Sequence, residues 1–306
     1  AMAGIATIAY TQEALTGASH KKVGPRFIPK ILGNIAAANI AIDYNIQGPS
    51  FTVSTACSSG GDAINTACMC MQSGKADIML AVGAESVLCP LVIYSLANAK
   101  ALSRRNDSPS TASRPFDVTR DGFVIGEGGG ALVLETEEHA LARGAKIYAE
   151  IRGCGNTDDA YHVTAPHPEG RGAIACMKQA IAEAGINPSD IGYINAHGTA
   201  TNKGDTVETS SIKKVFGNTL PYVSSTKGAT GHMMGAGGIT ETITCVKAIE
   251  TGTVPPTINL NEVDPECAGI DFVANIAKKA EINFAMSNAF GFGGQNSSII
   301  VGKYGK

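Results

Sequence analysis

Cys57 stands at the centre of Ser54-Thr-Ala-Cys-Ser-Ser-Gly-Gly61, where an apolar run gives way to a glycine-rich run. The apolar run, 51–56, predicts a strand, and residues 62–73 predict a helix. The cysteine is therefore expected at a helix N-terminus, where free N–H groups and the helix dipole favour an anion and lower the pKa of a thiol. Because an average cysteine is more often a small buried hydrophobe, this segment alone leaves both interpretations open.

Two histidines and a lysine follow further along the chain. His197 comes directly after the predicted strand 191–196, and Lys227 and His232 share a glycine-rich turn before a predicted helix that carries Glu241. Each residue alone is usually structural or solvated. Together, two neutral imidazoles that face a thiolate would donate hydrogen bonds to a developing enolate oxygen. This combination indicates carbon–carbon bond formation from thioesters.

A fourth motif, Asn288-Ala-Phe-Gly-Phe-Gly-Gly-Gln-Asn296, predicts a flexible turn between two strands, with Phe292 at its tip. Backbone N–H groups in such turns can hold the oxyanion of a tetrahedral intermediate. Strand ends and glycine-rich turns are also where α/β proteins build their sites. The four motifs are therefore expected to form one active site.

The elements that position these motifs alternate between strand and helix, which predicts an α/β fold. Short apolar runs predict strands at 51–56, 78–83, 131–135, 146–152, 191–196, 222–225, 282–287 and 297–302. Helical spacing with terminal glycines predicts helices at 62–73, 136–143, 171–184, 205–216 and 238–250. A boundary near residues 143–146 divides the chain into halves 1–145 and 146–306, and we expect the active-site residues to meet at their interface.

Between the motifs, residues 103–130 are rich in charge, proline and glycine, which predicts a long structured excursion. Within it, Gly126-Glu-Gly-Gly-Gly-Ala131 matches a dinucleotide-binding pattern. We reject that reading because the motif precedes a predicted strand instead of following one and opening a helix. A tight turn beside a packed strand is the better interpretation.

Composition describes an ordinary globular chain of 306 residues, with 44% hydrophobic residues and a net charge of -3. That charge favours neither nucleic acid nor a membrane as a partner, and we find neither a signal peptide nor a run of 18 apolar residues. The eight cysteines are scattered, which is typical of the reducing cytoplasm. Cys68 and Cys70 point to different faces of one predicted helix, so we expect no zinc site.

The motifs TACSSG, NAHGTAT, SSTKGATGHMMGAGG and NAFGFGGQN occur in an order and spacing that resemble one family. The chain is similar to the beta-ketoacyl-acyl carrier protein synthases of the elongating, type II class, over residues 1–304. The resemblance implies a thiolase-like fold, a five-layered αβαβα sandwich of two similar halves, and a homodimer. It also implies decarboxylative condensation of an acyl chain with malonyl-acyl carrier protein, giving 3-oxoacyl-acyl carrier protein, CO2 and free carrier protein in fatty acid elongation.

The same resemblance assigns roles to the residues of the motifs. Cys57 would accept the acyl chain, and His197 and His232 would assist the loss of CO2 and stabilise the enolate. Lys227 would orient groups and act electrostatically. Further roles implied by the resemblance are support by Asp205 and Glu241, an oxyanion hole from the N–H groups of Cys57 and Phe292, and gating of the acyl pocket by the Phe292 side chain.

Substrate-binding roles follow from the resemblance as well. Thr199 and Thr201 match positions that bind pantetheine, and Met2 and Leu96 match acyl-pocket positions. The basic residues Lys21, Lys22 and Lys100 match positions that dock the acidic acyl carrier protein. Substrates would arrive on the phosphopantetheine of that protein, with no other cofactor and no metal.

The family's opening strand-helix-strand-helix stretch has no counterpart in this sequence. We therefore expect an incomplete first half with an exposed sheet edge, which a missing N-terminal segment or a companion chain would complete. Two alternatives stay open: a polyketide-type ketosynthase, and a non-catalytic partner subunit or fragment that only binds carrier protein. A thiolase or an initiating synthase is less favoured, since initiating enzymes pair the cysteine with histidine and asparagine, whereas this chain has His232.

Overall fold

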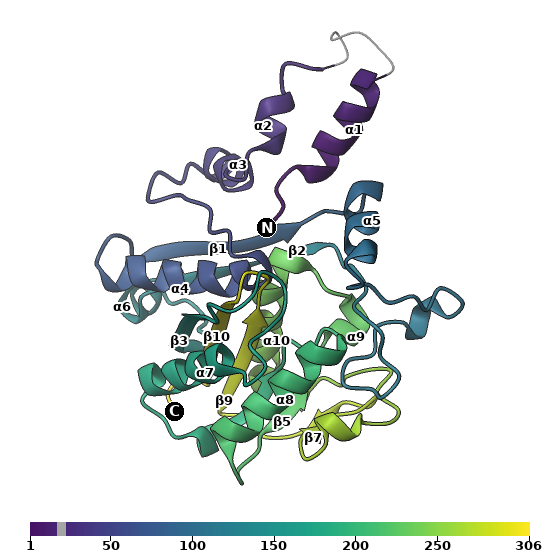
Figure 1. Ribbon diagram of the computed structural model, residues 1–306. Helices are drawn as coiled ribbons and strands as arrows, with labels where there is room; N and C mark the ends of the chain where they lie inside the picture. The colour runs from purple at the N-terminus through teal and green to yellow at the C-terminus, as the bar shows by residue number, and fades with distance from the viewer. Residues whose placement is uncertain (17–22) are drawn as a thin grey trace.

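Two β-sheets, with helices between and around them, organise the chain (Figure 1). The computed structural model describes residues 1–16 and 23–306. The strands are β1 (Ile78–Glu85), β2 (Gly128–Glu135), β3 (Glu150–Asp158), β4 (Ile191–Asn195), β5 (Tyr222–Ser224), β6 (Thr253–Val254), β7 (Asp271–Phe272), β8 (Lys278–Lys279), β9 (Phe284–Phe290) and β10 (Gln295–Gly302). The α-helices are α1 (Ile5–Thr16), α2 (Phe27–Ile31), α3 (Ile35–Tyr44), α4 (Ser59–Gln72), α5 (Pro90–Asn98), α6 (Glu137–Ala142), α7 (Arg171–Ala184), α8 (Asn202–Phe216), α9 (Lys227–Thr230) and α10 (Gly237–Thr251).

The larger sheet has six strands in the order β3-β10-β9-β4-β5-β7. The neighbours β9, β4, β5 and β7 run parallel, whereas β10 is antiparallel to both β9 and β3. The carboxyl ends of β4, β5 and β9 therefore lie at one edge of the sheet. The loops that leave these three strands carry the histidine, lysine and Phe292 motifs, so the topology gathers the motifs at one place.

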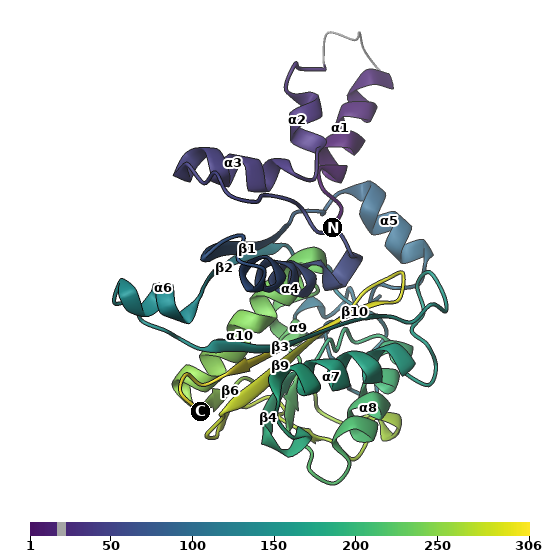
Figure 2. The same cartoon turned by 90° about the vertical axis from the view of Figure 1, so that its left-hand side faces the viewer.

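Helices and sheets alternate in layers (Figure 2). Helices α4 and α10 lie between the six-stranded sheet and the antiparallel pair β1–β2, and α7 and α8 cover the other face of the larger sheet. Helix α3 lies over the outer face of β1–β2, while α1 and α2 project away from the layers (Figure 1). The order is helix, sheet, helix, sheet, helix, as the predicted sandwich requires.

The six-stranded sheet has an apolar core on each face. Side chains alternate along its strands, so that Tyr193 and Ile299 pack toward α4 and α10 while Ile194 and Ile300 pack toward α7 and α8. All four of these side chains are buried. The sheet is thus anchored from both sides, which holds its carboxyl edge in place.

The first half has a smaller sheet than the second. Among the described residues, β1 pairs with β2 alone, and no residue of α1, α2 or α3 is buried. Ile42 and Tyr44 of α3 are each 76% exposed. The incomplete first half and the division at residue 145 both stay predictions.

The predicted strand 51–56 was wrong. The segment follows an irregular path and makes no strand pairing among the described residues, and the Phe51 side chain is 47% exposed. Its apolar and β-branched residues have strand propensity. Propensity alone does not form a strand, since an extended segment needs a neighbour for its backbone hydrogen bonds.

Two further boundaries differ from prediction because glycines pack against neighbouring elements. Helix α4 begins at Ser59 rather than at residue 62, and a Cβ on Gly60 would lie only 2.6 Å from the Ile239 backbone nitrogen. Strand β3 runs to Asp158 rather than ending at residue 152. The missing side chain of Gly155 lets the strand lie close to α7, since a Cβ there would be 2.0 Å from the Cys176 carbonyl oxygen. These glycines permit close approach instead of breaking the elements.

The other predicted helices and strands appear within a few residues of their expected places. Helix α7 matches 171–184, and residues 103–127 form the expected irregular excursion with only a short 3₁₀ turn. The interpretation of Gly126–Ala131 as a tight turn was wrong, because Gly128 to Ala131 are part of β2 and pair with β1. Local pattern was therefore sufficient for most elements of the layers.

Candidate active site

Cys57 and His232 are in direct contact at the centre of the molecule. The Cys57 Sγ lies 3.0 Å from the His232 Nε2, and the rings of His197 and His232 have centroids 5.3 Å apart at 87°. Cys57 sits in a 3₁₀ turn that leads into α4, His197 follows β4, and His232 follows α9. The structure thus brings three residues from three distant motifs into one buried group.

The pKa of Cys57 differs from the sequence-based expectation. Its position before α4 predicts a lowered pKa, but burial raises the pKa of the thiol to about 11. The Phe292 backbone N–H and the Lys227 ammonium act in the opposite direction without cancelling the effect of burial. In the free protein Cys57 is therefore a thiol, and a neighbouring base must accept its proton during reaction.

Both histidines are neutral. Burial lowers their pKa values well below the usual range, and the nearby Lys227 ammonium lowers them further. The His232 backbone N–H donates to the Val124 carbonyl (2.8 Å), and the edge of the Phe123 ring meets the His232 ring at a centroid distance of 5.3 Å. The imidazole of His232 is thus held in place and able to accept the thiol proton at Nε2.

Lys227 and Glu241 form a buried ion pair beneath the histidines. Lys227 is 1% exposed, and its Nζ donates to Glu241 Oε1. Burial raises the pKa of Glu241, and Lys227 opposes that rise. The Lys227 carbonyl also accepts a hydrogen bond from the Ser113 hydroxyl at 2.5 Å. An ammonium that is paired with a carboxylate at this position supplies positive potential to the site.

Asp205 supports the loop after His197. Its carboxylate accepts hydrogen bonds from the backbone N–H groups of Phe116 (2.7 Å) and Ala200 (3.1 Å), and the Arg120 Nε lies 3.5 Å away. Burial raises the pKa of Asp205 to about 6, although these contacts oppose the rise. Asp205 therefore ties the histidine loop to the 103–127 excursion, in line with its expected supporting place.

The sequence analysis missed Glu208, Arg120 and Ser225. Glu208 accepts hydrogen bonds from the backbone N–H groups of His197 and Gly198, each at 2.8 Å. The Ser225 hydroxyl donates to the Gly198 carbonyl at 2.6 Å. The position of Glu208 one helical turn after Asp205 was the available signal, because residues three apart share a helix face. Nothing in the local sequence singles out Arg120 or Ser225.

The β9–β10 turn reaches the nucleophile through its backbone. The Phe292 N–H hydrogen-bonds toward the Cys57 sulfur, and a Cβ on Gly291 would lie 3.2 Å from the Cys57 backbone nitrogen. Gly293 and Gly294 have φ values of 93° and 90°, which glycine adopts without strain. The Phe292 side chain is 39% exposed. The turn therefore places a donor beside the thiol and leaves the aromatic ring partly in solvent.

The remaining predicted positions are spread around this centre. The Thr199 and Thr201 hydroxyls lie 3.1 Å apart in the loop after β4, and Met2 and Leu96 pack on the apolar cluster that contains Cys57. Lys100 is exposed just beyond α5. Lys21 and Lys22 lie outside the described residues.

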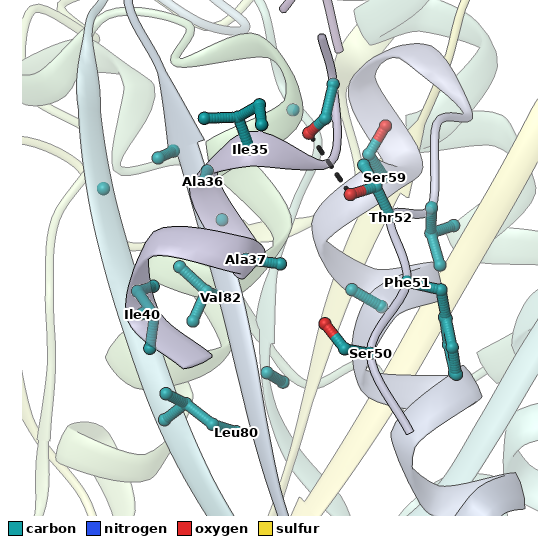
Figure 3. Close-up of a pocket in the computed structure, with 18 of the residues that line it drawn as sticks. Ile35, Ala36, Ala37, Ile40, Ser50, Phe51, Thr52, Ser59, Leu80 and Val82 are labelled. Atoms are coloured by element: carbon teal, nitrogen blue, oxygen red, sulfur yellow. Dashed lines mark hydrogen bonds between the residues drawn. The ribbon is translucent and has the colours of Figure 1, made fainter. Parts of the chain in front are cut away.

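A cavity of about 1200 Å³ lies apart from Cys57, His197 and His232. It lies between α3, residues 48–54 and the outer face of β1, where Ile35 and Ile40 face Leu80 and Val82 (Figure 3). Ser54 and Ser59, which line this cavity, lie directly before and after the Thr55–Ser58 turn that carries Cys57. Among the described residues, no cluster of three or more His, Cys, Asp or Glu side chains is arranged to hold a metal ion.

Comparison with known proteins agrees with this geometry. The family model described as "Beta-ketoacyl synthase, N-terminal domain" matches residues 1–140, and "Beta-ketoacyl synthase, C-terminal domain" matches residues 148–261. The chain belongs to the beta-ketoacyl synthase family. This synthase is therefore a condensing enzyme of the acyltransferase class, and its sandwich is the fold of that family.

Several relatives resemble the synthase over almost its whole length. It is 46% identical to 3-oxoacyl-[acyl-carrier-protein] synthase 2 of Rhizobium meliloti (strain 1021), with 98% of this chain and 71% of the relative covered. Against the synthase of the same name from Coxiella burnetii (strain RSA 493 / Nine Mile phase I), the identity is 45%, with 98% and 73% covered.

Solved ketosynthases share the fold. One, a type II polyketide ketosynthase in complex with its acyl carrier protein and bound to a hexaketide, superposes with a TM-score of 0.93 at 35% identity, covering 98% of this chain and 76% of the other. A beta-ketoacyl synthase from Burkholderia phymatum STM815 gives a TM-score of 0.91 at 36% identity, covering 99% and 72%. In the described part of the synthase, no helix is both long and apolar enough to cross a bilayer.

Proposed function

We propose that this chain condenses an acyl group held as a thioester on Cys57 with malonyl-acyl carrier protein in fatty acid elongation. The products are 3-oxoacyl-acyl carrier protein, CO2 and free carrier protein. The observation that carries the proposal is the buried contact of Cys57 Sγ with His232 Nε2 at 3.0 Å, beside a second neutral imidazole. The name shared by the relatives, 3-oxoacyl-[acyl-carrier-protein] synthase 2, points to the same reaction.

Acyl transfer is the first half of the reaction. His232 Nε2 accepts the thiol proton of Cys57, and the Sγ attacks the carbonyl carbon of the incoming thioester. The N–H groups of Cys57 and Phe292 hold the resulting oxyanion. The carbon–sulfur bond to pantetheine then breaks, and the departing thiolate takes the proton from the imidazole. The acyl group is left on Cys57 and the histidine is again neutral.

Condensation is the second half. The bond between the malonyl carboxylate and its α-carbon breaks, CO2 leaves, and the electron pair forms an enolate. In this half the proton of His232 must sit on Nε2, so the imidazole first exchanges its Nδ1 proton for one on Nε2. The Nε2–H groups of His197 and His232 then donate to the enolate oxygen. The enolate carbon attacks the acyl carbonyl on Cys57 and a carbon–carbon bond forms. The carbon–sulfur bond to Cys57 breaks, and the expelled thiolate takes up the one proton that the overall reaction consumes from water.

The other residues act around these steps. Lys227, held by Glu241, favours the negative charge that develops during both halves, and Asp205 keeps the loop after His197 in place. In the proposed complex, Thr199 and Thr201 bind pantetheine, Met2 and Leu96 line the acyl pocket, the Phe292 ring gates it, and Lys100 with Lys21 and Lys22 docks the acidic carrier protein. Phosphopantetheine on that protein brings the substrates, so no separate cofactor is needed. We expect the chain to work in the cytoplasm as a homodimer, with any missing segment supplied by a longer or companion chain.

Intact-protein mass measured after incubation with acyl-acyl carrier protein tests the proposal, with Cys57→Ala as the control. We expect one acyl increment on the wild-type chain and none on the control. Addition of malonyl-acyl carrier protein should then remove the increment and release CO2. If a folded wild-type chain acquires no acyl group, the proposal is overturned in favour of a non-catalytic partner subunit or fragment.

A polyketide-type ketosynthase is the second candidate, favoured by the TM-score of 0.93 to a type II polyketide ketosynthase. The two reactions share every catalytic step and differ in what happens to the 3-oxo group. Mass analysis of carrier-bound products from malonyl-acyl carrier protein, without a reductase, separates them. A single condensation supports fatty acid elongation, whereas repeated condensation to an unreduced chain supports the polyketide type.

A further inference from the structure

Asp62, in the first turn of α4, has a role that neither the motifs nor the reaction steps explain. Its side chain is almost completely buried, with 4% of the residue exposed. Asp62 Oδ2 accepts from the hydroxyls of Thr55 (2.5 Å) and Ser58 (2.9 Å), and Oδ1 accepts from Asn156 Nδ2 (2.6 Å). The Ser58 hydroxyl also lies 2.8 Å from the Thr55 carbonyl oxygen. Both oxygens of this buried side chain thus have hydrogen-bond partners, which a buried polar group needs.

The first two partners enclose the nucleophile. Thr55 and Ser58 flank the dipeptide Ala56-Cys57, and Ala56 has a φ of 51°, in the left-handed region that residues with a Cβ avoid. A conformation of this kind persists only when its surroundings hold it. The carboxylate of Asp62 bonds on both sides of Ala56, so it holds this turn closed.

The third partner connects the turn to the six-stranded sheet. Asn156 lies on β3 opposite Ser297 of β10, and the first residue of β10, Gln295, accepts a hydrogen bond from the Gly291 N–H at 2.6 Å. Gly291 in turn packs against the nucleophile turn, since a Cβ there would lie 2.8 Å from the Thr55 carbonyl oxygen. These contacts connect the turn that carries Cys57 with the β9–β10 turn that carries Phe292, the two sources of the proposed oxyanion-hole donors.

We propose that Asp62 is a positioning residue that sets the distance between the two oxyanion-hole donors by tying the Thr55–Ser58 turn to the β3–β10 strands. This inference rests on the proposed acyl transfer through Cys57. The step it serves is the attack of Sγ on the thioester carbonyl, in which the oxyanion forms and the pantetheine thiolate leaves. Donors aimed at a developing charge lose much of their effect when they are displaced by a fraction of an ångström.

A direct electrostatic effect of Asp62 on the Cys57 thiol and its effect through hydrogen bonds can be told apart. Loss of a nearby negative charge would change the thiolate and hence every reaction of the sulfur, whereas loss of the hydrogen bonds would displace the oxyanion donors. This difference separates two measurements: alkylation of Cys57, which needs only the thiolate, and acylation, which also needs the oxyanion hole.

The test compares Asp62→Ala, Asp62→Asn and Asn156→Ala with Asp43→Ala, an exposed control on α3. Single-turnover acylation of Cys57 by hexanoyl-pantetheine and alkylation by iodoacetamide are followed by mass, with thermal melting in parallel. We expect Asp62→Ala to slow saturating acylation about 100-fold, with alkylation changed less than about threefold, since removal of an oxyanion donor costs this much. Asn156→Ala should slow acylation about tenfold. Asp62→Asn keeps the shape and bonds both arms once the Asn156 amide turns to present its oxygen, so it should slow acylation about fivefold or less.

Acylation of Asp62→Ala at the wild-type rate would overturn the inference, as would acylation and alkylation that fall together. If Asp62→Ala fails to fold, Asn156→Ala provides the test, because Asn156 is an exposed residue whose truncation the fold should tolerate. An unchanged acylation rate in Asn156→Ala would also overturn the inference. If the wild-type chain is alkylated but never acylated, the proposed acyl transfer itself is wrong, and the inference falls with it. Only the last result contradicts the proposed function.

Discussion

Charged side chains are buried at the edge of the six-stranded sheet, whereas apolar side chains are exposed around the smaller sheet. At the carboxyl edge of the six-stranded sheet, Lys227, Asp205 and Glu208 are at most 2% exposed. Around β1–β2, in contrast, apolar side chains remain in solvent, including Val133 at 62% and Ile42 at 76%. Buried charges cost free energy and are retained where chemistry needs them, whereas exposed apolar groups contribute little to the core. The buried charges near the site therefore lie mainly in the second half, whereas Cys57 comes from the first.

The largest effect is expected where a buried charge loses its partner. Lys227→Met would leave the Glu241 carboxylate buried and unpaired, so we expect a loss of about 3–5 kcal/mol in the free energy of unfolding. The condensation rate should fall below detection because the positive potential at the site is lost. Denaturant unfolding and CO2 release measure the two effects.

The double variant Lys227→Met/Glu241→Gln serves as the control. It removes both charges, so most of the lost stability should return while activity should not. If the double variant is as unstable as Lys227→Met alone, the ion pair is not the cause. The buried charges at the edge of the six-stranded sheet would then matter less for stability than we infer.

The apolar cores give the next largest contrast. Ile239 is fully buried between the two sheets, and Ile239→Ala should cost about 2–5 kcal/mol through lost burial and a cavity. Ile42→Ala on α3 removes the same atoms from an exposed site and should change stability by less than about 0.5 kcal/mol. Urea midpoints for the two variants check this, and equal losses would contradict the comparison.

A pH effect follows from Glu208. Burial raises its pKa from 4.5 to about 7, so the folded state binds a proton more tightly than the unfolded state between these values. The free energy of unfolding should therefore fall as pH rises from 4.5 to 7, by on the order of 3 kcal/mol for this group. Glu208→Gln should flatten that part of the stability profile, and an identical slope in wild type and variant would show that another group is responsible.

The smallest effect concerns the thiol of Cys57. Because burial raises its pKa to about 11, its thiolate fraction should rise tenfold per pH unit with no plateau up to pH 10. The rate at which Cys57 is alkylated in the folded protein should accordingly increase about 100-fold from pH 7 to pH 9. The alkylation rate of a free cysteine, in contrast, levels off near its pKa of about 8.5. If the alkylation rate reaches a plateau at or below pH 8, the pKa of Cys57 is lowered, as its position at a helix N-terminus predicts.

The sequence was most informative where the signal is local. Helix α7 matched its prediction because helical spacing and the terminal Gly185 lie within one segment. Cys57, His197, Lys227 and His232 could be chosen because each stands at the end of an element, beside small or glycine residues, and strand ends gather at one edge of a sheet. Family resemblance then joined these separate motifs into one reaction.

Other features depend on elements that are distant in the chain. Residues 51–56 look like a strand, yet no described neighbour pairs with them. The predicted strand ended at residue 152, yet Gly155 lets β3 continue against α7. The hydrogen bonds of Asp62 and Glu208 join segments whose relation no local pattern reveals.

The sequence by itself determined the fold class, most of the elements and the choice of residues that we propose as the catalytic group. The tertiary structure alone decided that Cys57 is a thiol of raised pKa, which groups keep both imidazoles neutral, and that Asp62 bridges the nucleophile turn and β3. The reason is physical: propensity and spacing act within a segment, whereas desolvation and hydrogen-bond partners are contributed by every segment that packs around a group.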